Sequence, residues 1–258
     1  EMLGSTVGSA AWLVAGNLYN GQAAVIVFFL ISGFVIHYPY AKGRPFEPFS
    51  FLTGRLLRIG LPLAVVLVIA GLAFEVRPLA YTGIWSLGCE LIYYLLYPLL
   101  RRLRELTGSW TRLYLLALVV AALVLGSVGL PEVSEPGRLQ DFPIFGHGLT
   151  WLTGLPIWIL GCHAAESDWG RLKGARTLVR LWVMRVGVLG LSVLFGILKF
   201  HGDRIFGVDV PNWLSLHLFA VAAYFWMRWE IQWHFKHPPS NILEWGGVWS
   251  YSLYIVHP

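Results

Sequence analysis

Apolar runs of nearly membrane-spanning length recur along the whole chain of 258 residues, and short charged stretches separate them. Hydrophobic residues make up 57% of the sequence and charged residues only 13%, whereas a soluble domain carries about 25% charged residues. So few charges cannot shield so much apolar surface from water. The composition therefore excludes an ordinary water-soluble domain. It predicts an all-α polytopic transmembrane helical bundle that forms a single domain over residues 1–258.

Eight apolar segments stand out, and each predicts one membrane-spanning helix, giving about eight spans. The segments are residues 23–38, 59–74, 83–100, 113–130, 144–162, 178–199, 212–227 and 245–258. Several are shorter than the roughly 20 residues that a straight span needs. We therefore expect flanking aromatic residues at the membrane interface to extend them.

Positive charge alternates between the connecting loops. Lys and Arg outnumber the acidic residues in loops 39–58, 101–112 and 163–180, but not in loops 75–82, 131–143 and 200–211. Basic loops stay on the cytoplasmic side, so this alternation assigns them to the cytoplasm. It also accounts for the net charge of +5 without a nucleic-acid partner, and it leaves membrane lipids as the surroundings of the bundle.

This orientation places residues 1–22 outside the membrane, although they contain no signal peptide. We therefore expect at least one further helix before Glu1, which stands where an initiator methionine would. The last apolar segment is still running at Pro258, so we also expect a further C-terminal part.

A glutamate near the middle of segment 83–100 is the most informative polar residue. Ser86, Glu90, Tyr94 and Tyr97 share one helical face, and Leu91, Leu95 and Leu99 form the opposite face. A carboxylate inside hydrocarbon costs about 2.5–3.5 kcal/mol, so Glu90 should face a cavity or a partner rather than lipid. Either it is a functional group, or it pairs with an arginine or a hydroxyl to lock two helices together.

The other candidates are weaker when taken one at a time. Ser32 and Gly33 are small residues that allow close helix packing. Arg55 and Arg58 lie on adjacent turns, where they either obey the positive-inside rule or clamp phosphate groups. His217 is either hydrogen-bonded within the bundle or lines the same cavity as Glu90. Cysteine and histidine spacing gives no metal site.

Four stretches, taken together and in order, carry a resemblance. They are VIVFFLISGFVI from residue 25, FLTGRLLRIGLPL from residue 51, IWSLGCELIYYLLYPLL from residue 84 and GGVWSYSLYIVHP from residue 246. With these motifs the chain resembles the acyltransferase 3 family of bacterial integral-membrane acyltransferases. The resemblance covers most of the chain and implies an enzyme in the bacterial inner membrane.

The resemblance implies transfer of an acyl group, usually acetyl from acetyl-CoA, to a hydroxyl of a cell-envelope carbohydrate or lipid-linked glycan. It implies that Arg55 and Arg58 bind the donor and that Glu90 is catalytic. The other residues that it places in the family motifs, or that the polar stripe adds, are Ser32, Gly33, Trp85, Ser86, Tyr94, Ser250, Tyr251 and His257. His217 joins the candidate cavity residues on its position alone, outside the motifs.

Two features depart from the family pattern. The family's first helix, which carries a basic residue and a histidine acting in acyl transfer, has no counterpart in the 258 residues. The gap between Arg58 and Trp85 is also short for the family. We therefore expect residues 1–258 to be inactive alone.

Acyl transfer needs a base for the hydroxyl proton and a donor for the oxyanion. We hypothesise that Glu90 orients or charges the family's histidine, as a triad carboxylate steadies its imidazole. Direct base action by Glu90 is the weaker version of this hypothesis. The competing hypotheses are a proton-coupled transporter, in which Glu90 and His217 relay protons, and an inactive fragment or scaffold.

Overall fold

The computed structural model describes residues 20–65, 68, 85–128, 149–167, 177–207, 212–242 and 244–247. Its elements are α2 (Gly21–Ala41), α3 (Pro48–Arg55), the π-helical turn η1 (Leu56–Gly60), α5 (Trp85–Thr107), α6 (Trp110–Val128), α7 (Thr150–Ala165), α8 (Leu178–Phe206) and α9 (Asn212–Lys236). Within these described ranges the regular structure is entirely helical, which confirms the all-α class.

Most predicted apolar segments coincide with helices, and several helices run further than the segments did. α3 lies within the expected loop 39–58, and α5 continues to Thr107, α8 to Phe206 and α9 to Lys236, where we expected loops. Those loop predictions were wrong because backbone hydrogen bonding can carry a helix past its apolar part, and the end of α9 contains Arg, Glu and Lys, which are good helix formers. Of segment 59–74, only residues 59–65 and 68 are described.

The expected number of membrane spans is not confirmed. In the described residues, two helices are long and apolar enough to cross a membrane, Gly21–Ala41 and Leu178–Leu198. A third span results if α5 and α6, which meet at 115°, are counted as one bent pair. Part of the shortfall is physical, because α7 has only 16 residues and a straight span needs about 20.

Helices α2 and α7 form the most intimate contact in the bundle, and glycines permit it. A Cβ at Gly33 would collide with the backbone carbonyl oxygen of Trp158, and one at Gly161 with that of Leu30. In a membrane the hydrophobic effect does not drive helices together, because lipid is as apolar as their side chains. Helices there associate through close packing at small residues. Gly33 is therefore a packing residue, which was one of its two predicted roles.

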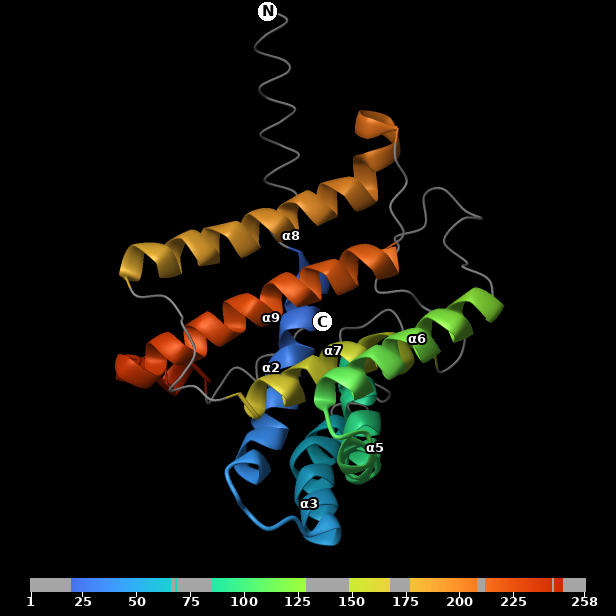
Figure 1. Ribbon diagram of the computed structural model, residues 1–258, viewed down its shortest axis with the longest axis vertical. Coiled ribbons are helices and arrows are strands. Elements are labelled where there is room, and N and C mark those ends of the chain that lie inside the picture. Colours follow the sequence, from blue (N-terminus) through green and yellow to red (C-terminus); the bar gives the residue numbers. More distant parts are fainter. Residues whose placement is uncertain are drawn as a thin grey trace, which may run out of the picture.

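The remaining helices surround this pair. Helix α7 also packs on α5, α6 and α9, and α8 lies along α9 (Figure 1). In Figure 1, α3 and α5 lie at the bottom of the view and α8 lies near the top. Asn20 ties the start of α2 to α8, because its side chain caps the Ala23 amide at 3.1 Å and donates to the Ser192 carbonyl at 3.0 Å.

A sharp corner separates α5 from α6. Gly108 adopts a φ of +72°, and its amide donates to the Arg104 carbonyl at 2.8 Å, so it ends α5 as glycine commonly ends helices. The Ser109 hydroxyl then accepts the Thr111 amide at 3.1 Å and starts α6. This corner fixes Arg104 and Trp110 close together on two different helices.

Candidate active site

Glu90 lies inside the bundle and is bound by hydroxyl groups. Its side chain is 3% exposed, and its Oε1 accepts hydrogen bonds from Ser32 on α2 and from Tyr94 on α5. The Trp158 indole of α7 donates in turn to the Ser32 hydroxyl at 3.1 Å. We call Ser32, Glu90, Tyr94 and Trp158 the interior network. Three helices thus converge on one carboxyl group.

The predicted polar stripe on α5 is confirmed. Ser86, Glu90, Tyr94 and Tyr97 are all buried, whereas the opposite-face residue Leu95 is 54% exposed. Leu99 is likewise exposed, whereas Leu91 is half-buried against the core, so the predicted outer face is narrower than the sequence suggested.

One oxygen of Glu90 has no partner among the described residues. Glu90 Oε2 is shielded from solvent and makes no hydrogen bond to any described residue. A buried acceptor left without a donor costs about 1–3 kcal/mol, and more if it is charged. Glu90 Oε2 therefore needs a hydrogen-bond donor, which must come from outside the described residues.

Arg55 approaches this network from the end of α3. Its guanidinium carbon lies 6.0 Å from the centre of the Tyr94 ring, within cation–π range. Phe51, one turn earlier on α3, also packs its ring on Tyr94, at 6.3 Å. Arg58 lies in the π-helical turn and is exposed. The two arginines thus differ, since only Arg55 contacts a residue that binds Glu90.

The other predicted site residues lie around the interior network or outside the described residues. Trp85 packs edge-on against Phe29, 6.4 Å between ring centres, and Ser86 is fully buried. His217 is buried on α9, where its Nδ1 lies 2.7 Å from the Trp213 carbonyl oxygen, and its Nε2 has no hydrogen-bond partner among the described residues. Three predicted residues lie beyond the described ranges: Ser250, Tyr251 and His257.

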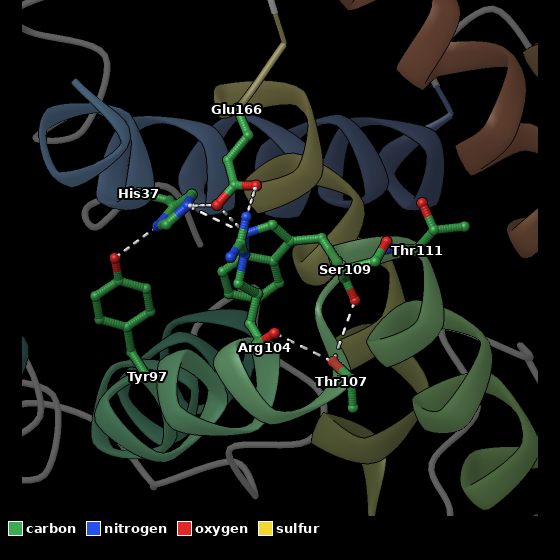
Figure 2. A network of polar contacts seen from close by, with 8 residues as sticks. His37, Tyr97, Arg104, Thr107, Ser109, Thr111 and Glu166 are labelled. Carbon is green, nitrogen blue, oxygen red and sulfur yellow. Dashed lines mark hydrogen bonds and ion pairs between the residues drawn. The ribbon is translucent and has the colours of Figure 1, made fainter. Parts of the chain in front are cut away.

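A second polar cluster lies where α2, α5, α6 and α7 end or begin (Figure 2). We call its residues, His37, Tyr97, Arg104, Trp110 and Glu166, the rim network. Glu166 is its centre: its Oε1 accepts the Trp110 indole N–H at 2.9 Å and lies 3.1 Å from His37 Nε2, while its Oε2 accepts from Arg104 at 2.7 Å. The Nδ1 of His37 lies 2.8 Å from the Tyr97 hydroxyl.

The rim network is the cytoplasmic end of the bundle in the orientation that loop charge predicts. His37 ends the first apolar segment, Arg104 follows the third, and Glu166 follows the fifth. All three positions were assigned to the same side of the membrane, and the structure brings their side chains into contact.

The Glu166 carboxylate is strongly favoured in its charged form. Partial burial raises its pKa, but hydrogen bonds from His37, Arg104 and Trp110, together with the Arg104 charge, outweigh burial and bring the pKa to about 2. This carboxylate therefore acts as a clamp between helices α2, α5, α6 and α7, and it is ionised at any physiological pH.

A cavity of about 340 Å³ opens beside the rim network. Residues lining it include His37, Tyr40, Arg101, Arg104, Trp110 and Glu166. In the sequence, Arg101 and Arg104 are two of the basic residues that indicate topology, and Glu166 is one acid in a basic loop, so spacing alone did not mark this cluster as a site. The Gly108–Ser109 pair could have pointed to this cluster. Glycine commonly ends a helix and serine commonly begins one, so the pair predicts a corner that brings the start of α6 close to the end of α5.

Chemically, the two networks differ in what they could do. The interior network offers a carboxyl group with a free acceptor oxygen, as a group that positions or receives a proton requires. The rim network offers guanidinium donors beside a cavity, as anion binding requires.

Comparison with known proteins gives one finding. A family model for acyltransferase 3, described as an acyltransferase domain, matches residues 3–258. Neither the curated proteins nor the solved structures contain a match to the chain.

Proposed function

Because the chain belongs to the acyltransferase 3 family, we propose that it is a membrane-bound enzyme that moves an acetyl group from a CoA thioester to a hydroxyl of a cell-envelope carbohydrate or lipid-linked glycan. The family match and the apolar helices indicate a membrane protein of an acyltransferase family. Donor, acceptor and location in a bacterial inner membrane are part of the proposal.

The observation that carries the proposal is the geometry of Glu90. A carboxyl group held by Ser32 and Tyr94, whose second oxygen has no partner in the described part of the chain, can receive one more donor. An ion pair that only locked helices together would have both carboxylate oxygens partnered, as Glu166 has. This favours an active-site role for Glu90 over the structural one.

The reaction divides into a proton transfer and an acyl transfer. A base removes the proton from the acceptor hydroxyl, and the oxygen attacks the thioester carbonyl. The new C–O bond forms as the C–S bond breaks, and the thiolate leaves with a proton as CoA thiol. Glu90 Oε2 orients the base or stabilises its charge, while Arg55 and Arg58 bind anionic parts of the donor.

The family assignment also bears on the alternatives. It supports an acyltransferase over a proton-coupled transporter, in which Glu90 and His217 would relay protons.

The test is mass spectrometry of envelope glycans from cells that carry the full-length gene, its deletion, or Glu90→Gln. We expect glycan acetyl groups to disappear on deletion and in Glu90→Gln. The matched control is Glu47→Gln, because Glu47 is exposed and makes no capping hydrogen bond on α3. Retention of acetylation by a folded Glu90→Gln enzyme would refute the role of Glu90, and unchanged glycans on deletion would refute the acceptor class.

A further inference from the structure

Two arginine side chains that line the cavity beside the rim network have donors without acceptors. Arg101 Nη1 and Arg104 Nε are shielded from solvent, and neither makes a hydrogen bond within the described ranges. Buried guanidinium N–H groups in folded proteins are nearly always paired with protein, water or an ion. Two such donors at one cavity indicate that a ligand with acceptor oxygens belongs there.

Arg101 is held in place by aromatic rings rather than by an acid. Its guanidinium carbon lies 4.6 Å from the ring centre of Phe46 and 5.6 Å from that of Tyr40. In the described part of the chain it forms no ion pair. Stacking fixes the plane of the guanidinium while leaving its charge and its N–H fork available.

Two carboxylates, Glu105 and Glu166, also line the cavity, but they leave part of the positive charge of Arg101 and Arg104 uncompensated. Both oxygens of Glu166 already accept hydrogen bonds, and Arg104 Nη2 compensates the Glu166 charge at 2.7 Å. Glu105 is exposed to solvent, which screens it. Arg101 therefore keeps the uncompensated positive charge of the site.

We propose that Arg101 and Arg104 form a binding site for a phosphate group of an organic phosphate at the cytoplasmic end of the bundle, separate from Arg55 and Arg58. Guanidinium forks match phosphate oxygens in geometry and charge. A cavity of about 340 Å³ admits a phosphorylated group rather than a single water. Resting on the proposed function, the phosphate is that of the CoA donor; a phospholipid headgroup is the other source of the same chemistry.

The position of the site suits a long donor. Arg101 stacks on Phe46, whose ring lies 5.5 Å from that of Phe51, and Phe51 contacts Tyr94 beside Glu90. A series of ring contacts thus links the phosphate site to the interior network. We expect a donor bound by its phosphate at Arg101 to point its acyl end towards the carboxyl group.

The test compares Arg101→Gln with Arg102→Gln in the purified full-length protein. Arg102 is the next residue, is exposed and does not line the cavity, so both variants lose one charge from the same turn. Binding of CoA, dephospho-CoA and inorganic pyrophosphate is measured by calorimetry, and binding of phosphatidic acid in nanodiscs is measured by thermal shift. A second variant, Arg101→Lys, keeps the charge and guards against misfolding.

We expect Arg101→Gln to weaken CoA binding about tenfold or more, and Arg102→Gln to change it less than about twofold. Arg101→Lys should fall between them. Loss of phosphatidic acid binding alone would retain the phosphate site and assign it to lipid. Unchanged binding of all four probes in Arg101→Gln would overturn the site.

The two proposals can fail separately. A protein that binds pyrophosphate through Arg101 but transfers no acyl group refutes the enzyme and keeps the site. An active enzyme whose KM for acetyl-CoA and whose binding of phosphatidic acid are the same in Arg101→Gln and Arg102→Gln keeps the enzyme and refutes the site.

Discussion

Glu90 and Glu166 are two carboxyl groups in one small bundle, and their surroundings differ in kind. Glu90 is buried, binds the hydroxyls of Ser32 and Tyr94, and has one oxygen without a partner in the described chain. Glu166 is 29% exposed and binds Arg104, His37 and Trp110 through both oxygens. A fully partnered acid stabilises a fold, whereas an incompletely partnered one is available for chemistry.

The largest expected effect is on kcat, and it separates the two roles when each glutamate is replaced by glutamine. In the full-length enzyme, Glu90→Gln should lower kcat by about 10²–10⁴-fold, because an amide cannot stabilise a charged base. Glu166→Gln should change kcat by less than about tenfold and instead lower the Tm, because about 1–3 kcal/mol of charged hydrogen bonding is lost. Acetylation assays and thermal melts in detergent measure both. A large loss of kcat in Glu166→Gln with little loss in Glu90→Gln would contradict the comparison.

The packing beneath the interior network should be nearly as sensitive. Gly33→Ala places a methyl group on the Trp158 carbonyl and pushes α7 away from Ser32, at a cost of about 1–3 kcal/mol. Gly190→Ala on α8 is the matched control, since a Cβ there meets nothing within 4 Å. The control should be neutral or stabilise by up to about 1 kcal/mol through helix propensity. Equal Tm values for the two variants would exclude the close α2–α7 contact.

A smaller effect is expected when the interior network loses one hydroxyl. Ser32→Ala removes a donor to Glu90 and the acceptor of the Trp158 indole, which should destabilise the fold by about 1–3 kcal/mol. We expect kcat to fall about tenfold, because Tyr94 still holds the carboxyl group. Thr53→Ala serves as a control, since within the described residues the Thr53 hydroxyl donates to the backbone carbonyls of Phe49 and Ser50 on the same helix. A kcat as low as that of Glu90→Gln would show that Ser32 itself takes part in the chemistry.

The smallest effect is a pH dependence confined to the rim network. The pKa of Glu166 falls from 4.5 to about 2, so its contribution to stability is complete above pH 4.5 and is lost as the pH falls towards 2. The Tm of the wild-type protein should therefore drop over this range by more than that of Glu166→Gln. Melting curves between pH 6 and pH 2 test this, and parallel losses in both proteins would show that another group titrates.

Sequence alone determined the parts of this protein that depend on local spacing and on the solvent. Composition required helices in a membrane because hydrocarbon cannot satisfy an unpaired backbone. The helical period placed Ser86, Glu90, Tyr94 and Tyr97 on one buried face, and loop charge assigned His37, Arg104 and Glu166 to one end. Family motifs indicated the acyltransferase family that the match over residues 3–258 establishes.

Tertiary structure decided which of these groups meet. No spacing along the chain relates Ser32 to Glu90 or Arg104 to Glu166, because 58 and 62 residues separate them. Their contacts depend on the glycine-mediated approach of α2 to α7 and on the corner at Gly108. Hydropathy also could not set the lengths of α8 and α9, because a helix is held by its own hydrogen bonds and need not end where the apolar residues end.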